Sequence, residues 1–163
     1  MGTNIARILT TVGLSAAVVT AGAVPAQSAQ PPAPDIAVLT GIRTATHPTF
    51  DRVVLDFSGP RPQVSSRFVD ELVRDGSGEV EELPGAAFAE VRMTPAQAHD
   101  DAGNSSYPGP RKFRTANLNN VMAVAITGDY EAYLSIGVGM RKQTWVNAFT
   151  LDAPTRVVID VGR

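Results

Sequence analysis

The chain has 163 residues, 44% of them hydrophobic, and its 14 basic and 16 acidic side chains give a net charge of −2. A weakly acidic chain without a basic tract is not typical of nucleic-acid-binding proteins, so we exclude nucleic acid as a partner. The chain contains no cysteine, which excludes disulfides and thiolate metal sites. The fold therefore has to be stabilised by its core alone.

The first 29 residues have the three-part order of a secretory signal peptide. Arg7 is their only charged residue, and an uncharged run follows it from 8 to 24. Small residues offer two cleavage points, after Ala26 or after Ser28, and the pattern does not choose between them. We expect cleavage rather than a retained membrane anchor, because an apolar run of about 17 residues is at the short limit for a span. Without a cysteine we expect no lipid anchor either, so the mature protein would be secreted and extracytoplasmic.

Residues 30–36 form a Pro-rich stretch that we expect to be an extended spacer. From 37 to 163 the chain consists of short apolar or alternating segments separated by Gly, Pro, Asp and Asn, which is typical of all-β proteins. About eight of these segments fit strands, enough for a two-sheet β-sandwich. The predicted strands are residues 38–46, 52–57, 63–69, 87–93, 121–126, 134–140, 147–151 and 156–161.

Two segments between the predicted strands carry predictions of their own. Thr94-Pro95-Ala96-Gln97 combines an N-cap residue, a proline at the first helical position and a glutamine, and so predicts one short helical turn. Residues 100–111 form a long, turn-rich loop, and loops of this length in small domains are commonly either functional or disordered.

A short sequence near the start of the domain is echoed at its end: Arg52-Val-Val-Leu-Asp56 and Arg156-Val-Val-Ile-Asp160. In a strand, the arginine and the aspartate of each copy lie on one face, about 13 Å apart. We expect cross-strand ion pairs between the arginines and aspartates of this region. The candidates are Arg43, Arg52 and Arg156 with Asp51, Asp56 and Asp160.

Seven short motifs follow one another along the domain. They are Gly41-Ile42-Arg43, residues 47–57 (HPTFDRVVLDF), residues 75–78 (DGSG), residues 83–86 (LPGA), residues 129–131 (DYE), residues 136–141 (IGVGMR) and residues 151–160 (LDAPTRVVID). In this order they resemble the AMIN-like domain of secreted and lipid-anchored bacterial envelope proteins, over residues 37–163. The resemblance implies a non-catalytic β-sandwich that targets proteins to peptidoglycan. Two departures are the missing lipid-anchor cysteine and the lack of an accompanying catalytic domain, so any enzyme it targets would be a separate protein.

We expect no cofactor and no metal site. The histidines, His47 and His99, are far apart in the sequence, and no third histidine or cysteine completes a common zinc set. Asp100, Asp101 and Asn104 hint at calcium but lack the spacing of an EF-hand.

Nothing in the sequence marks a catalytic residue, so we expect a protein that is not an enzyme. No serine lies in a Gly-x-Ser-x-Gly motif, and Ser77, between two glycines, is typical of a turn. No spacing among the glutamates indicates an acid and its partner for glycoside cleavage. The alternative is a secreted hydrolase acting on wall polymer or a small ester, which would bring a serine or a carboxylate pair to one of the histidines.

Aromatic side chains are the candidate ligand-binding groups, because the C–H faces of sugars pack on aromatic rings. The candidates are Tyr107, Tyr130, Tyr133 and Trp145, and Tyr107, Tyr133 and Trp145 are the selected set. Tyr133 shares a strand face with Gly137 and Gly139, which would form a flat strip. The competing interpretation is that these glycines allow another segment to approach closely. The expected partner is a cell-wall polymer, or else a secreted protein that binds the 100–111 loop.

Overall fold

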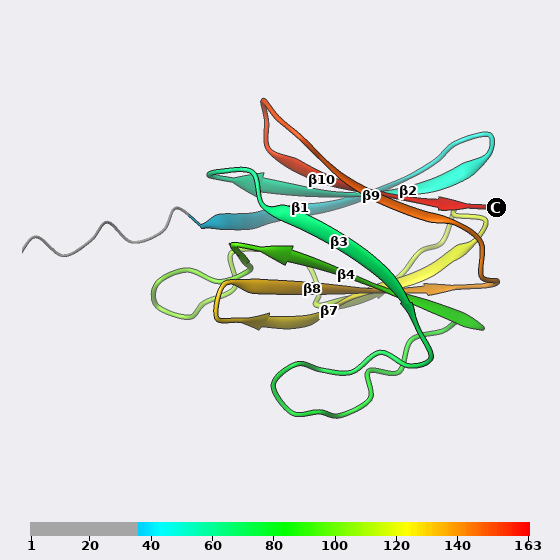
Figure 1. Ribbon diagram of the computed structural model, residues 1–163, viewed down its shortest axis with the longest axis horizontal. Helices are drawn as coiled ribbons and strands as arrows, with labels where there is room; N and C mark the ends of the chain where they lie inside the picture. The colour runs from blue at the N-terminus through cyan, green and yellow to red at the C-terminus, as the bar shows by residue number, and fades with distance from the viewer. Residues whose placement is uncertain (1–35) are drawn as a thin grey trace, which may run out of the picture. The chain divides into compact units, whose positions relative to one another are not determined.

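Ten strands in two sheets make up the part of the chain that the computed structural model describes, residues 36–163 (Figure 1). The first sheet has the order β5 (Ala96–Gln97), β1 (Ala37–Thr46), β2 (Phe50–Ser58), β10 (Arg156–Gly162) and β9 (Val146–Leu151). The second has the order β3 (Gln63–Val69), β4 (Ala87–Thr94), β8 (Tyr133–Met140), β7 (Val121–Tyr130) and β6 (Lys112–Arg114). Neighbouring strands are antiparallel except β1 and β5.

The predicted fold class is confirmed, and so are all eight predicted strands. The two strands that the sequence did not indicate, β5 and β6, are two and three residues long, too short to show an alternating pattern. The predicted signal peptide (1–29) and all but the last residue of the predicted spacer (30–36) lie outside the described residues. Between residues 36 and 163 no helix is long and apolar enough to cross a membrane.

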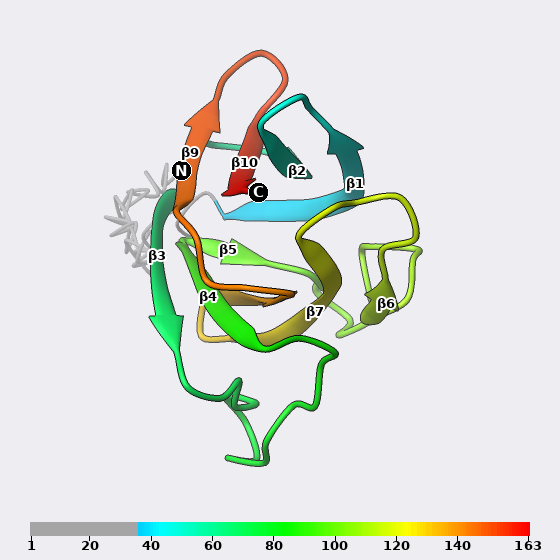
Figure 2. The same ribbon diagram turned by 90° about the vertical axis from the view of Figure 1, so that its right-hand side faces the viewer.

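The core lies between the two sheets and follows directly from strand alternation. In β2, every second residue from Asp51 to Phe57 points inward and is buried, while the residues between them are only half-buried. β3 and β9, the edge strands on one side, pack against each other and close that side (Figure 2). The largest fully buried side chains are Leu39, Val53, Leu55, Val91, Met93, Val121, Val124, Leu134, Ile136, Val138, Met140 and Ile159.

The outer face of the second sheet is covered by the segment from 70 to 86, which runs beneath β7 and β8 in Figure 1. Leu72 and Leu83 of this segment form a second apolar cluster with alanines of β7. A Cβ atom on Gly137 would lie 2.7 Å from Leu72 Cδ1, and one on Gly139 would lie 2.4 Å from the Pro84 carbonyl oxygen. The flat open strip is therefore wrong, and the competing interpretation, a close neighbouring segment, is confirmed.

Two of the predicted ion pairs are present on the outer face of the first sheet. Arg43 binds Asp56 through two hydrogen bonds of 2.7 Å, and Arg52 binds Asp160 through two of 2.6 and 2.7 Å. Arg156 lies opposite Asp56, but its Nε donates to the Pro154 carbonyl at 3.2 Å instead. The predicted pairing of Asp51 on this face is wrong, because strand alternation turns it to the other side of the sheet, into the core.

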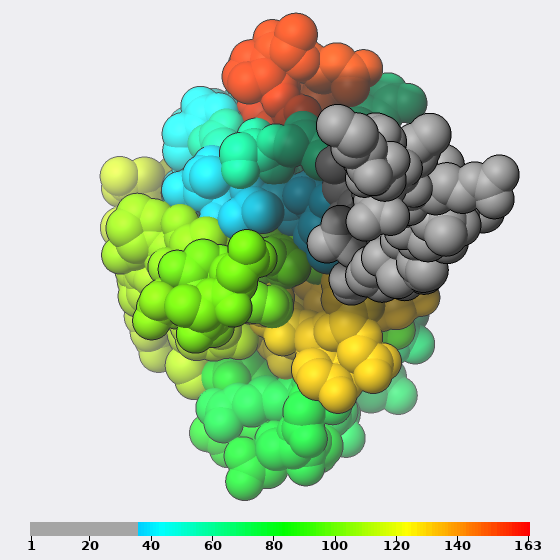
Figure 3. All heavy atoms as spheres, turned by 90° about the vertical axis from the view of Figure 1, so that its left-hand side faces the viewer, coloured from blue at the N-terminus to red at the C-terminus, as the bar shows by residue number. Residues whose placement is uncertain are grey.

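One of the two predictions for the connecting segments is wrong. Ala96 is not in a helical turn: its N–H donates to the Ala132 carbonyl at 2.9 Å, and it pairs in parallel with Ala37 as part of β5. The 100–111 loop is anchored to the rest of the domain, because Ser106 donates to the Leu39 carbonyl of β1 at 2.8 Å and Tyr107 is buried in the core. Of the two expectations for this loop, disorder is excluded and a functional role stays a prediction. Figure 3 shows this loop beside the turn between β7 and β8. Deleting the loop would remove part of the core. Loss of partner binding in such a variant would therefore not distinguish a lost contact from a destabilised fold.

Because the 70–86 segment packs on the second sheet, we expect two glycine substitutions to change the free energy of unfolding by different amounts. Gly139→Ala places a methyl group against the Pro84 carbonyl, and we expect it to lower the free energy of unfolding by about 1–3 kcal/mol. Gly76→Ala is the matched control, because nothing lies within 4 Å of its Cβ position. Urea denaturation of both variants measures the difference. Equal effects at the two positions would contradict the close packing of the 70–86 segment on β8.

Candidate functional site

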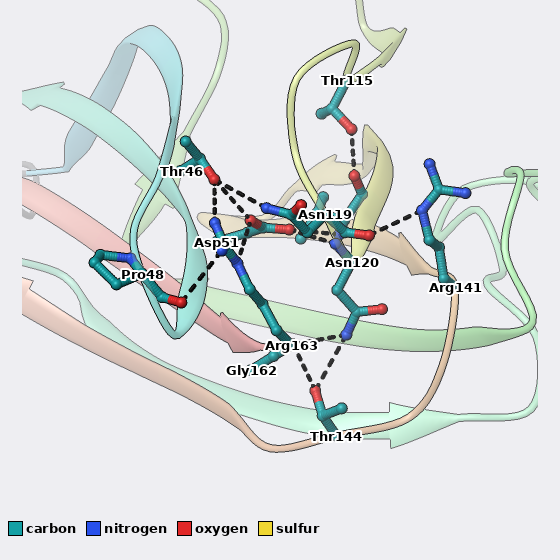
Figure 4. A network of polar contacts seen from close by, with 11 residues as sticks. Thr46, Pro48, Asp51, Thr115, Asn119, Asn120, Arg141, Thr144, Gly162 and Arg163 are labelled. Atoms are coloured by element: carbon teal, nitrogen blue, oxygen red, sulfur yellow. Dashed lines mark hydrogen bonds and ion pairs between the residues drawn. The ribbon is translucent and has the colours of Figure 1, made fainter.

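Four segments distant in sequence meet at one end of the sandwich, the end at which the C-terminus is marked in Figure 1. They are the hairpin between β1 and β2, the residues that lead into β7, the connection from β8 to β9, and the residue after β10. Figure 4 shows their side chains converging in one network of polar contacts. Two buried polar residues, Asp51 and Asn120, lie at its centre.

Asp51 is fully buried, and its carboxylate is satisfied mainly by backbone N–H groups. Oδ2 accepts the N–H of Asn120 at 2.6 Å and that of Val121 at 3.0 Å, and Arg163 Nε lies 3.6 Å from Oδ1. Burial disfavours the charged form, but these N–H groups and those of Asn119 outweigh it, so the pKa of Asp51 is held below its ordinary value. The ionised side chain thus joins β2 of the first sheet to the start of β7 in the second.

Asn120 extends this link to the other two segments. Its side-chain amide donates to the Gly162 carbonyl at 2.7 Å and to the Lys142 carbonyl and the Thr144 hydroxyl, both at 3.2 Å. Its Oδ1 accepts the Lys142 N–H at 3.1 Å. One buried amide therefore positions the 141–145 connection against the end of β10.

Three of these segments line an open hollow of about 310 Å³, through Asn119, Asn120, Arg141, Lys142 and Arg163. We call it the basic pocket. None of the residues that line it is acidic, and the nearby Asp51 carboxylate is already satisfied. Arg141 is oriented by donating to the Asn119 carbonyl at 2.9 Å, whereas the Lys142 ammonium has no hydrogen bond or ion pair within residues 36–163. Arg163 is engaged by Asp51, the Thr46 hydroxyl and the Pro48 carbonyl, so Lys142 is the cation that is most available. A hollow lined by cations and by no acidic residue suits an anionic group.

Trp145 comes shortly after Lys142 in the sequence, and 50% of its surface is exposed. Its ring covers Gly162 so closely that a Cβ there would lie 2.5 Å from Nε1. The ring centroid lies 6.2 Å from that of Phe50, on which His47 stacks at 4.4 Å. The end of the sandwich therefore combines cations with an exposed aromatic surface.

The three selected aromatic residues do not meet in one site. Trp145 does not line the basic pocket, but its ring packs on Gly162 at the same end of the sandwich. Tyr133 begins β8, whose eight residues extend about 25 Å toward the other end. Tyr133 is exposed, and the guanidinium of Arg92 lies 5.6 Å from its ring centroid. Tyr107 is 8% exposed and packs in the core, so its ring offers no open face to a ligand.

The sequence contains a signal for the centre of the network. Asp51 occupies the inward face of an alternating strand, in line with Val53 and Leu55, where a carboxylate needs several hydrogen-bond donors. The donors are the backbone N–H groups of residues 120 and 121, about 70 positions away, and no local sequence pattern identifies them.

One arrangement is relevant to the hydrolase alternative. His99 Nδ1 lies 2.9 Å from Asp129 Oδ2, and Ser105 lies opposite His99 in an isolated bridge. However, the Ser105 hydroxyl donates to the Tyr107 carbonyl at 2.8 Å and not to the imidazole. Within the described residues, no three histidine, aspartate or glutamate side chains are grouped closely enough to hold a metal ion.

The lowered pKa of Asp51 predicts how the stability depends on pH. Because the pKa is lower in the folded protein than in the unfolded chain, the carboxylate stabilises the fold above about pH 4 and loses this effect as the pH falls through the folded value. Asp51→Asn presents an NH₂ group or a weaker acceptor to the two N–H groups, and we expect a loss of about 2–4 kcal/mol at pH 7.

Urea denaturation of the parent and of Asp51→Asn between pH 2 and pH 7 measures this difference, with Asp101→Asn, an exposed loop position, as the control. The gap between parent and Asp51→Asn should narrow below about pH 4. A gap that stays constant over the whole range would contradict an ionised Asp51.

The sequence profile of the family described as AMIN-like domain matches residues 37–163. No curated protein and no solved structure matches the chain. The matched region comprises all ten strands, the basic pocket and Trp145. The chain therefore belongs to the AMIN-like domain family.

Proposed function

We propose that this protein is a non-catalytic module that binds peptidoglycan, and that the basic pocket with Trp145 is the binding surface. AMIN-like domains are modules of bacterial envelope proteins, so this chain is a cell-envelope module. The observation that carries the finer assignment is the group of three cations, Arg141, Lys142 and Arg163, around one hollow without an acidic lining residue.

The chemistry of peptidoglycan matches this surface in two respects. Its peptide stems carry free carboxylates, which arginine and lysine bind by charge-assisted hydrogen bonds. Its glycan strands present apolar C–H faces, and the half-exposed Trp145 ring is placed to receive one. A surface with both groups recognises the polymer at the point where the peptide joins the sugar.

The surface is organised before any ligand arrives. Asn120 fixes the 141–145 connection and Asp51 fixes Asn120, so little of the backbone has to be ordered on binding. Preorganisation of this kind lowers the entropic cost of association. The exposed cations are screened by salt, so the binding should weaken as the ionic strength rises.

The proposal excludes catalysis, and the serine contacts support this. A nucleophilic serine is activated through a hydrogen bond to its base, whereas Ser105 and Ser106, the serines nearest His99 in the sequence, both donate to backbone carbonyls. The alternative, a secreted hydrolase, predicts soluble fragments when the purified protein is incubated with sacculi. We expect none, and sustained release of fragments would favour the hydrolase.

Sedimentation of the purified protein with peptidoglycan sacculi tests the binding. We expect Trp145→Ala to weaken binding about 10-fold, as the loss of an aromatic contact at the centre of a site does. Lys142→Gln should weaken it severalfold and reduce its dependence on salt, since it removes a cation that has no partner in the fold. Tyr133→Ala is the matched control: it removes an equally exposed ring at the opposite end, and binding should be unchanged.

A parent protein that stays in the supernatant would overturn the proposal and favour a secreted protein as the partner. If the protein sediments but Tyr133→Ala abolishes the binding and Trp145→Ala does not, peptidoglycan is the ligand and the basic pocket is not the site.

A further inference from the structure

A second hollow, of about 600 Å³, opens beside the last residues of β7 and shares no residue with the basic pocket. Residues 126–130 of β7 form its floor. One wall is the turn at 74–77, and the other is the pair Arg111 and Lys112 at the start of β6. We call it the Arg111 cleft.

The walls of the Arg111 cleft are fixed by contacts with each other and with the floor. The N–H of Asp75 donates to the Thr127 carbonyl at 3.1 Å, which attaches the turn to β7. The buried carboxylate of Glu81 accepts from Arg74 at 2.6 Å and from Lys112 at 2.5 Å, which joins the two walls. The hydrogen bond from Arg74 also holds the pKa of Glu81 below its ordinary value, so this clamp is ionised at neutral pH.

The acidic groups of the cleft are already engaged. Glu81 is shared by two cations, and Asp129 is bound by the His99 imidazole and by the N–H of Ala98, both at 2.9 Å. Arg111 differs from them: its guanidinium makes no hydrogen bond or ion pair within residues 36–163. The cleft therefore keeps one cation, with its five N–H donors, that the fold does not use.

A second polar group is also left without a partner. Thr127 is 4% exposed and lines the cleft, and its hydroxyl is the one buried side-chain polar atom in the described residues that has no hydrogen bond. Buried hydroxyl groups are nearly always satisfied, so an orphan one needs a reason. This hydroxyl oxygen is fully buried, however, and a ligand in the open cleft does not reach it. At the mouth of the cleft Tyr130 exposes 69% of its surface, which places an aromatic ring beside Arg111.

We propose that the Arg111 cleft is a second binding site, which takes a sugar bearing an anionic group. The planar guanidinium of Arg111 binds a carboxylate or a phosphate through two parallel hydrogen bonds. The Tyr130 ring packs on the apolar face of the sugar ring. A volume of about 600 Å³ is within the range of small-molecule sites. The site is separate from the basic pocket, so the proposal does not depend on peptidoglycan binding there.

Titrations of the purified protein with soluble sugars, followed by the shifts of backbone amide signals in NMR, test the proposal. The probes are glucuronate, which carries a carboxylate, glucose 6-phosphate, which carries a phosphate, and neutral glucose. We expect saturable shifts at Gly76, Ser77 and Gly128 with an anionic sugar and none with glucose. A response to glucuronate alone or to glucose 6-phosphate alone identifies the anionic group, and either supports the site.

Substitutions then locate the binding. Arg111→Gln should weaken it at least 10-fold, whereas Arg114→Gln, an equal loss of charge outside the cleft on β6, should leave it unchanged. Thr127→Val should leave it unchanged, because the hydroxyl is fully buried below the cleft. Trp145→Ala should have no effect, which separates this site from the basic pocket.

Three results would overturn the proposal: no saturable shift with either anionic sugar, equal shifts with glucose, or unchanged binding in Arg111→Gln. Loss of sacculus binding with intact sugar binding would leave the Arg111 cleft standing and overturn only the proposed wall-binding surface.

Discussion

A carboxylate removed from water and held by backbone N–H groups connects the two sheets at the end of the sandwich. Asp51 belongs to the first sheet, and the N–H groups of Asn120 and Val121 that it accepts begin β7 of the second. An unpaired buried charge would cost several kcal/mol, so the two segments are fixed relative to each other as long as Asp51 is ionised. Asn120 then positions the 141–145 connection through its side chain, and with it the cations and the tryptophan of the proposed surface.

Much of the outer face of each sheet is occupied by the protein's own side chains or by a covering segment. The outer face of the first sheet is occupied by the pairs Arg43–Asp56 and Arg52–Asp160, each held by two hydrogen bonds. The outer face of the second sheet is covered by the 70–86 segment, which packs on the glycines of β8. Of the hollows between residues 36 and 163, the basic pocket lies at the end of the sandwich, and the Arg111 cleft is one that the covering segment itself helps to form.

The sequence predicted the architecture because strand alternation is a local property. Short apolar or alternating segments located all eight long strands, and repeated arginine and aspartate pairs located two cross-strand ion pairs. The surface was not predictable in the same way. The glycines of β8 fit an open strip and a covered face equally well, and the burial of Tyr107 depends on a loop whose partners lie far away in the sequence. The partners of Asp51 became visible only once the fold had brought residues 51 and 120 together.

The central claim is that the surface organised by Asp51 and Asn120 receives peptidoglycan. Soluble muropeptides, which contain both the peptide carboxylates and the sugar ring, can be titrated into the purified protein while the indole N–H of Trp145 and the backbone amides are followed by NMR. The account predicts saturable shifts of the Trp145 indole and of Asn119 and Lys142, with the amide of Tyr133 unmoved. Shifts that centre on Tyr133, or no shift at the highest muropeptide concentration, would contradict it.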